Sequence, residues 1–247
     1  MNIVLRVKKM TNVAIFGSNG AIGSEFVQQL LLNEEVEKIY AISRTPSKHN
    51  DKKVISLKCN ITDEESLKNS AQIIKKDNKL DAIIFAAGIL HFDSKMPEKS
   101  IRHISIGYMQ KVFEINTIAP ALVMKEFLPL LKNDKKTIFA AISARVGSIS
   151  YNQLGGWYSY RASKSALNML LKSASIEMKR KNKDSVIVGL HPGTVSSDLS
   201  KPFQSNVKPK NLFTPEYSVS KLIDVISNLE PNDSGKVFAY DGEIIEP

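Results

Sequence analysis

The sequence predicts a doubly wound α/β fold, in which one parallel sheet of about seven strands carries helices on both faces. Short apolar runs alternate with helical stretches from one end of the chain to the other. The apolar runs are continuous rather than alternating with polar residues, as expected for strands that are buried on both faces. The length of 247 residues suits one large domain, and no linker-like segment interrupts the alternation.

The predicted strands are the seven apolar runs, and the predicted helices lie between them. The strands are Asn12 to Phe16, Lys38 to Ile42, Lys53 to Lys58, Asp81 to Ala86, Lys136 to Ile142, Val186 to Leu190 and Lys236 to Tyr240. The helices are Ala21 to Asn33, Asp63 to Lys76, Tyr108 to Lys132, Tyr158 to Lys181 and Pro215 to Asn228. Thr62 with Glu65 three residues later has the pattern of a capping box, so Thr62 is the expected helix cap. The one long irregular segment, Ser196 to Phe213, has the length of a lid or binding loop.

The composition indicates a globular protein of a reducing, cytoplasmic setting. Hydrophobic residues make up 43% and charged residues 24%, and no apolar run approaches the ~20 residues of a membrane span. Residues 1–10 are too short for a signal peptide, so we expect an N-terminal extension before a single domain at 11–247. Cys59 is alone, which rules out a disulfide within the chain and predicts a core residue.

The net charge of +9 does not by itself indicate a nucleic-acid partner. The lysines are spread along the chain, and the densest runs, Lys135-Lys136 and Lys179 to Lys183, fall at predicted element ends. We interpret them as solvated surface that helps to attract a phosphate-rich ligand. The four histidines have no metal-ligand spacing, and the chain has no Gly-x-Ser-x-Gly elbow, so neither a metal site nor a serine hydrolase is expected. His191 is expected to be structural, and Trp157 is expected either to line a substrate pocket or to lie in the core.

A glycine-rich turn joins the first predicted strand to the first helix. It reads Gly17-Ser18-Asn19-Gly20-Ala21-Ile22-Gly23. Glycines let the backbone turn tightly and approach a pyrophosphate, which the N–H groups and dipole of the following helix stabilise. The spacing Gly-x-x-Gly-x-x-Gly differs from the common dinucleotide fingerprint, so a plain strand–helix turn is the alternative. The position of the turn in the chain favours a dinucleotide.

The end of the second strand indicates which dinucleotide is bound. In such folds an acidic residue at this place favours the free ribose 2′-hydroxyl of NAD, and a basic residue favours the 2′-phosphate of NADP. Here Ser43 and Arg44 supply a hydroxyl and a cation, with no acid. NADP is therefore favoured over NAD, the alternative being that Arg44 is only a surface charge.

Tyr160 and Lys164 are the candidate catalytic pair. They lie four residues apart at the start of a predicted helix, so they share one of its faces. An ammonium beside a phenol favours tyrosinate, so we expect Lys164 to lower the pKa of Tyr160. A phenol of this kind can give a proton to a carbonyl oxygen as hydride arrives from a nicotinamide.

With these motifs the chain resembles the short-chain dehydrogenase/reductase family over nearly its whole length, most closely the branch of C-factor-like and sniffer-like carbonyl reductases. The resemblance implies that Asn116 supports the proton relay and that homodimers or homotetramers form through the 108–132 and 158–181 helices. It also implies cofactor contacts from residues that match the family's turns and loops. These are Asn60 with Ile61, Ala86, Ala87 and Gly88, and Pro192, Gly193, Thr194, Val195 and Ser197.

One position departs from the family pattern. The family's catalytic serine aligns with Ala144, and Ser143 lies beside it. Three interpretations stay open: Ser143 supplies the hydroxyl, Ser148 or a backbone group orients the substrate, or the substrate needs less help at its oxygen, as in pteridine reduction. Losing such a donor typically costs ~10²–10³ in rate.

The sequence therefore predicts an NADPH-dependent reductase of a ketone, aldehyde or related small molecule. Its rival is a catalytically weak NADP-binding protein with a regulatory or signalling function, which Ala144 motivates and the intact Tyr160, Lys164 and Asn116 oppose.

Overall fold

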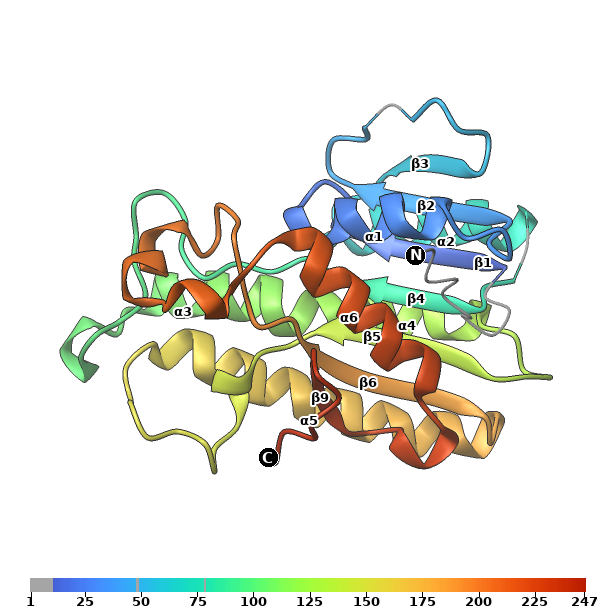
Figure 1. Ribbon diagram of the computed structural model, residues 1–247. Coiled ribbons are helices and arrows are strands. Elements are labelled where there is room, and N and C mark those ends of the chain that lie inside the picture. Colours follow the sequence, from blue (N-terminus) through green and yellow to red (C-terminus); the bar gives the residue numbers. More distant parts are fainter. Residues whose placement is uncertain (1–10, 48, 78) are drawn as a thin grey trace.

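A parallel sheet of seven strands forms the centre of the protein, as predicted (Figure 1). The structure, a computed structural model, describes residues 11–247 except 48 and 78, so the expected N-terminal extension lies outside the described residues. The strand order is β3-β2-β1-β4-β5-β6-β9. From β1 the chain first adds strands on one side of the sheet and then, from β4 on, adds them on the other side. The strands are β1 (Asn12–Phe16), β2 (Lys38–Ser43), β3 (Val54–Lys58), β4 (Ala82–Phe85), β5 (Thr137–Ile142), β6 (Ser185–His191) and β9 (Val237–Ala239).

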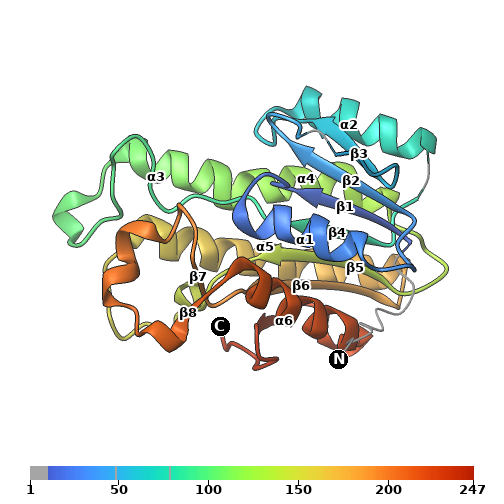
Figure 2. The same cartoon turned by 45° about the horizontal axis from the view of Figure 1, so that its top comes forward.

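Helices cover both faces of this sheet. The α-helices are α1 (Ala21–Leu31), α2 (Glu64–Asp77), α3 (Ile106–Phe113), α4 (Ala119–Phe127), α5 (Tyr158–Lys181) and α6 (Pro215–Asn228). The apolar sides of α2, α4 and α5 form one core with the sheet, and those of α1 and α6 form the other. Figure 2 shows α1 and α6 together in front of the strands. Burial on both faces explains the continuous apolar runs in the sequence.

The helix predicted over 108–132 is not continuous, which corrects the sequence prediction. Between α3 and α4 the chain makes a π-helical turn, Glu114–Ile118, and after α4 it tightens into the 3-10 helix Leu128–Leu130. Pro120 at the start of α4 has no N–H to donate and so interrupts the regular hydrogen-bond ladder. Single π-turns of this kind often occur at functional sites.

The predicted cap of α2 is also wrong by one residue. The Oδ1 atom of Asp63 accepts the N–H groups of Glu65 and Ser66, at 3.0 and 3.4 Å. The hydroxyl of Thr62 instead donates to Asn60 Oδ1. The helix begins one residue later than predicted, so a carboxylate rather than a hydroxyl meets its positive end.

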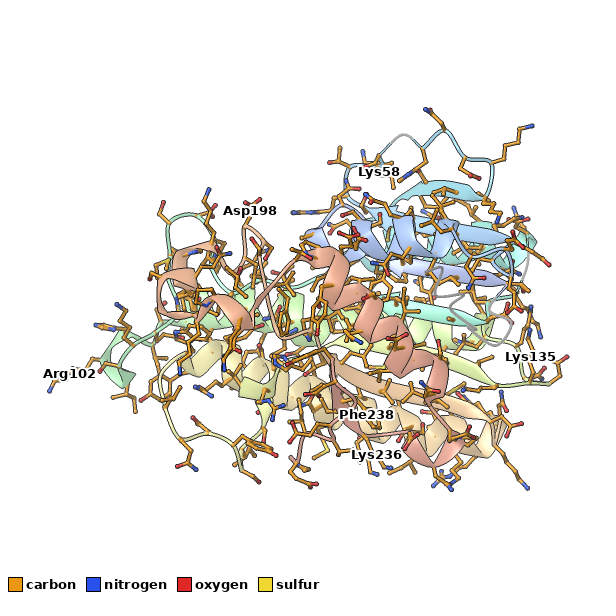
Figure 3. All side chains as sticks on the ribbon, in the orientation of Figure 1. Lys58, Arg102, Lys135, Asp198, Lys236 and Phe238 are labelled. Carbon is orange, nitrogen blue, oxygen red and sulfur yellow. The ribbon has the colours of Figure 1, made fainter. Side chains whose placement is uncertain are left out.

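The long segment 196–213 is tied at its base rather than wholly irregular. Two short parallel strands, β7 (Thr194–Val195) and β8 (Leu212–Phe213), pair across it. Between them lie the 3-10 helices Lys201–Asn206 and Pro209–Asn211. The segment therefore projects from the sheet as a closed loop, at the end where Asp198 lies in Figure 3.

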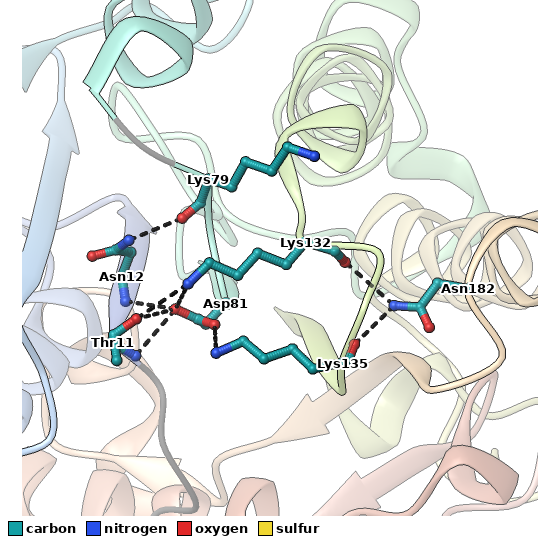
Figure 4. A network of polar contacts seen from close by, with 7 residues as sticks. All are labelled: Thr11, Asn12, Lys79, Asp81, Lys132, Lys135 and Asn182. Carbon is teal, nitrogen blue, oxygen red and sulfur yellow. Dashed lines mark hydrogen bonds and ion pairs between the residues drawn. The ribbon is translucent and has the colours of Figure 1, made fainter.

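A buried carboxylate organises the opposite end of the sheet (Figure 4). Asp81, just before β4, is 1% exposed and accepts the hydroxyl of Thr11 at 2.6 Å and the N–H of Asn12 at 2.9 Å. Lys132 and Lys135 pair with it at 3.0 and 2.5 Å. Burial alone would raise the pKa of this carboxyl, but the hydrogen bonds from Lys135, Thr11 and Lys132 outweigh burial and lower it. Lys135 is thus structural, not merely solvated as its sequence context indicated.

Cys59 is fully buried in the core, which confirms the prediction for it. Within the described residues, none of the helices is both long and apolar enough to pass through a membrane.

Candidate active site

A cleft of about 400 Å³ opens at the carboxyl ends of the strands, where the strand order reverses. Ligands of doubly wound folds bind at this place. The cleft brings together predicted residues from five separate stretches of sequence. They are Asn19, Gly20, Ala21, Ile22, Ala86, Ala87, Gly88, Ser143, Tyr160, Lys164, Pro192, Gly193, Thr194, Val195 and Ser197.

The glycine turn is built for close packing and fits a phosphate group. Gly17 has φ +77°, and a Cβ there would lie 2.8 Å from the backbone nitrogen of Ala87. A Cβ on Gly23 would lie 2.2 Å from the carbonyl oxygen of Gly17, so α1 can begin this close to the turn only with glycine. Gly20 caps α1 without a side-chain hydrogen bond, and the first turn has no acidic residue. The first N–H groups of α1 are therefore not used by a side-chain cap and can bind an anion.

The loop after β2 is held against this turn. The amide of Asn19 donates to the carbonyl of Thr45, and its Oδ1 accepts the hydroxyl of Ser47 at 2.7 Å. Ser43 donates to the same Thr45 carbonyl at 2.9 Å. Arg44 lies between these anchored residues and is itself exposed, so its guanidinium is available beside the turn.

Five other predicted contact residues lie around the cleft rather than in its lining. Ser18 is buried and its N–H donates to Ile42 O, so it fastens the turn to β2. Asn60 is exposed and accepts the hydroxyl of Thr62, while Ile61 packs partly against the core. Gly17 and Gly23 lie beneath the lining and shape it through their backbone.

Asn116 joins three parts of the site from the π-helical turn. It is fully buried, and its side chain both accepts the N–H of Ile89 at 2.9 Å and donates to the carbonyl of Ile89 at 2.8 Å. Its amide also donates to Ser163 Oγ, on α5, at 3.2 Å. The π-turn therefore connects the loop after β4, at Ile89, to α5, the helix that carries Tyr160.

Tyr160 and Lys164 lie one turn apart on α5 and both reach the cleft. They are 9% and 3% exposed. Lys164 Nζ lies 5.8 Å from the centre of the Tyr160 ring and donates to the carbonyl of Ile142, at the end of β5, at 2.8 Å. That bond holds the ammonium between the phenol and the end of the sheet.

The pKa of Tyr160 moves in the opposite direction to the sequence prediction. Burial raises the pKa of the phenol to about 12 and lowers that of Lys164 to about 8. Removal from water disfavours the charged form of both groups. Tyr160 therefore stays protonated at neutral pH, which is the form that can donate a proton.

None of the three residues considered for the hydroxyl beside Tyr160 presents a free hydroxyl to the cleft. Ala144 packs in one apolar cluster with Tyr160, so a methyl group occupies that place. Ser143 lines the cleft, but its hydroxyl donates to Asn168 Oδ1 at 2.6 Å. Ser148 is buried outside the lining and accepts the N–H of Tyr151.

An aromatic wall beside Tyr160 was not predicted in full from sequence. Trp157, for which pocket and core were both open, packs with Phe203 at 4.8 Å and with Tyr160 at 6.2 Å between ring centres. Leu90 and Val146 complete the wall. These residues come from four separate segments of the chain and share no periodic pattern, so only the fold brings them together.

Glu98 fixes the start of α5 and was not singled out from sequence. Its carboxylate is 3% exposed and accepts both the N–H of Ser159, at 3.1 Å, and the Ser159 hydroxyl. Its backbone carbonyl accepts the N–H of Trp157, whose φ is +50°. The negative charge meets the positive end of α5, one residue before Tyr160.

The Pro-Gly loop after β6 forms the last side of the cleft. Gly193 has φ +74°, and a Cβ there would lie 2.5 Å from the ring of Phe213. The carbonyl of Pro192 accepts the hydroxyl of Ser218, on α6, at 2.7 Å. His191, which sequence reasoning took as structural, also lines the cleft, and its Nδ1 atom is buried without a hydrogen-bond partner. Across residues 11–247, leaving out 48 and 78, no group of acidic, histidine or cysteine side chains is arranged to bind a metal ion.

Comparison with known proteins agrees with this geometry. The family model described as short chain dehydrogenase matches residues 11–208. A 1-hydroxy-2-glutathionyl-2-methyl-3-butene dehydrogenase of Rhodococcus sp. (strain AD45) is 33% identical over 188 residues, which are 75% of this chain and 77% of that protein. The C-signal protein of Myxococcus xanthus is 36% identical over 134 residues, which are 54% of this chain and 75% of that protein. The crystal structure of an NADPH-bound carbonyl reductase from chicken fatty liver has a TM-score of 0.85 and 27% identity, and the match covers 97% of this chain and 95% of that one.

Proposed function

Because this chain belongs to the short-chain dehydrogenase/reductase family, we propose that it is an NADPH-dependent reductase of ketones or aldehydes. One observation carries the proposal. Tyr160 and Lys164 lie in the same cleft as a glycine turn whose helix N-terminus is open to a phosphate. That combination supports a proton donor close to a bound nicotinamide and a carbonyl.

The nicotinamide, when bound, supplies the hydride. Tyr160 donates its phenolic proton to the substrate oxygen, and the raised pKa keeps that proton in place until the oxygen becomes basic. The Lys164 ammonium stabilises the tyrosinate that remains. Asn116 fixes the loop after β4 to α5, and so fixes the distance between the two sides of the cleft.

Arg44 supports NADP rather than NAD as the cofactor. Its guanidinium is exposed on a loop that Asn19 and Ser43 anchor beside the glycine turn. A guanidinium binds a phosphate through paired hydrogen bonds, and no carboxylate lies in the Ser43–Ser47 stretch to repel it. The NADPH-bound carbonyl reductase supports the same choice by likeness.

The wall beside Tyr160 supports an apolar or aromatic carbonyl substrate. Leu90, Val146, Trp157 and Phe203 present carbon atoms to the cleft, and Ala144 adds a methyl group. A flat apolar group packed against this wall gains roughly 25 cal/mol for each Å² removed from water.

Exposed apolar side chains on the helices support a homo-oligomer. Ile118 on the π-turn and Met169 and Ile176 on α5 are 52%, 65% and 51% exposed. These side chains belong to the helical layer that Figure 1 shows on one face of the sheet. A second copy that covers these side chains forms a dimer. Light scattering after size exclusion measures the molar mass, and a monomer at micromolar concentration contradicts the dimer.

The cytoplasm is the proposed location of the protein. The buried thiol of Cys59 is compatible with a reducing compartment.

The function is tested by NADPH oxidation on a panel of aromatic and aliphatic carbonyl compounds. We expect turnover with aromatic ketones or aldehydes, and a preference for NADPH over NADH. The decisive variant is Tyr160→Phe, which keeps the ring and removes the proton.

Ala144 favours one second candidate, an NADP-binding protein that performs little chemistry. The methyl group beside Tyr160 removes a donor that supports the substrate oxygen. On this alternative NADPH binds tightly, yet no carbonyl or pteridine substrate is reduced, and Tyr160→Phe changes nothing measurable.

A further inference from the structure

The substrate oxygen needs a second hydrogen-bond donor besides Tyr160, and the serine position does not supply it. Ala144 has no hydroxyl, and the proton of Ser143 is directed to Asn168. Lys164 donates to Ile142 O. The cleft serines after β7 are also engaged, because the hydroxyls of Ser197 and Ser200 both donate to the carbonyl of Val195.

His191 is a polar side chain of the cleft that is close in strand register to this gap. Strands β5 and β6 still pair there, since the N–H of Ser143 donates to Leu190 O at 2.8 Å. In this register Ser143 lies opposite His191, and Ala144 follows Ser143 beyond the end of β5. Ala144 and His191 both line the cleft together with Tyr160.

The environment of His191 decides which ring nitrogen carries hydrogen. The ring is neutral, because burial and, to a smaller extent, the Arg145 guanidinium lower its pKa to about 4 against the opposing effect of Asp241. Its Nδ1 atom is buried and has no hydrogen-bond partner. A buried N–H without an acceptor costs more than a buried nitrogen that only lacks a donor, so the hydrogen belongs on Nε2.

We propose that His191 donates an Nε2–H hydrogen bond to the substrate oxygen, and so replaces the hydroxyl that Ala144 lacks. This role rests on the proposed reductase function. The imidazole neither gives up nor takes a proton in the reaction: the hydride and the Tyr160 proton account for both hydrogens added to the carbonyl. A neutral imidazole polarises a carbonyl in this way in other enzymes.

Arg145 adds to the effect of burial in keeping His191 neutral. Its guanidinium pairs with Glu243 at 2.7 Å and lies 5.3 Å from the centre of the Tyr151 ring. These contacts fix a positive charge near the imidazole, and an imidazolium there would be repelled. A neutral donor can stabilise developing negative charge without first losing a proton.

The test compares four variants with the wild type on the carbonyl that the panel selects. His191→Phe keeps a ring of similar size and removes the donor, and His191→Gln keeps an amide N–H near the place of Nε2. The double variant Ala144→Ser/His191→Phe restores the serine hydroxyl. His103→Phe makes the same chemical change at an exposed histidine and is the matched control.

We expect His191→Phe to lower kcat/KM about 10²-fold, mainly through kcat, as for the loss of one donor to a developing oxyanion. His191→Gln retains more activity, the double variant regains at least a tenth of wild-type activity, and His103→Phe matches the wild type. NADPH binding, followed by nicotinamide fluorescence, stays unchanged in every variant. Independently of activity, ¹⁵N NMR of histidine-labelled protein shows His191 as the neutral Nε2–H tautomer.

Three results would overturn the role of His191. They are an unchanged kcat/KM in His191→Phe, no recovery in the double variant, and an Nδ1–H tautomer. If Tyr160→Phe loses turnover while His191→Phe keeps it, the reductase function stands and only this inference falls. A wild-type protein inactive on every carbonyl overturns both, whatever the tautomer.

Discussion

Replacing Lys164 by methionine should stabilise the protein while abolishing its proposed activity. Lys164 is 3% exposed, and burial lowers the pKa of its ammonium from 10.5 to about 8. The folded protein at pH 7 therefore holds a charged group that water would solvate better. Methionine has a similar length and an adaptable apolar chain, so it fills the same space without that charge.

The magnitude follows from the pKa and from one hydrogen bond. A depression of this size disfavours the charged folded state by about 3 kcal/mol, at 1.36 kcal/mol for each pKa unit. Against this gain, Lys164→Met leaves the buried carbonyl of Ile142 without its donor, which costs about 1–2 kcal/mol. We expect the variant to be more stable than wild type by about 1–2 kcal/mol at pH 7.

The advantage of the variant depends on pH in a definite direction. Between about pH 8 and pH 10.5 the unfolded wild type binds the lysine proton and the folded wild type does not. Wild-type stability therefore rises with pH across this window, and the difference from Lys164→Met shrinks. The exposed Lys179, on the same helix, provides a matched control in Lys179→Met.

Urea unfolding at about pH 7 and about pH 9.5 measures both parts of the prediction, provided that the slope m is the same for each protein. Lys164→Met should raise the midpoint at the lower pH and lose most of that gain at the higher one. A variant that is less stable than wild type at pH 7, or whose gain is the same at both pH values, would refute the reasoning from burial.

Two further predictions concern the far end of the sheet and the cofactor. Asp81→Asn should lower the free energy of unfolding by about 2–4 kcal/mol at pH 7, since it leaves Lys132 and Lys135 without their buried partner. Because the pKa of Asp81 is lowered in the folded protein, this difference from wild type should narrow as the pH falls through that pKa. Urea midpoints measured at decreasing pH test this. Arg44→Ala should weaken NADPH binding about tenfold and leave NADH binding unchanged, in fluorescence titrations at fixed salt; equal losses for both cofactors would assign Arg44 another function.

The sheet and the main parts of the site could be predicted from sequence because their signals are local. Each strand is a continuous apolar run, the glycine turn occupies seven consecutive residues, and Tyr160 and Lys164 share a helix face by spacing alone. The matched order of strands and helices then places these motifs at one end of the sheet.

The features that were missed depend on contacts between distant segments. The ion pairs of Lys132 and Lys135 with Asp81 and the wall containing Phe203 join residues that are far apart in the chain. The break at 114–118 is the exception, since it lies next to Pro120. The direction of the Tyr160 pKa was wrong because spacing indicates proximity to Lys164 but not burial. His191 was taken as structural because nothing in its neighbours shows that Nδ1 lacks a partner.

The most direct test of the proposed chemistry is the kcat of Tyr160→Phe, measured as NADPH oxidation with the best carbonyl of the panel. The proposal predicts a loss of roughly 10²–10⁴-fold, the range for a positioned general acid, with NADPH affinity within a factor of about two of wild type. An unchanged kcat would contradict the central claim that the Tyr160 phenol supplies the proton.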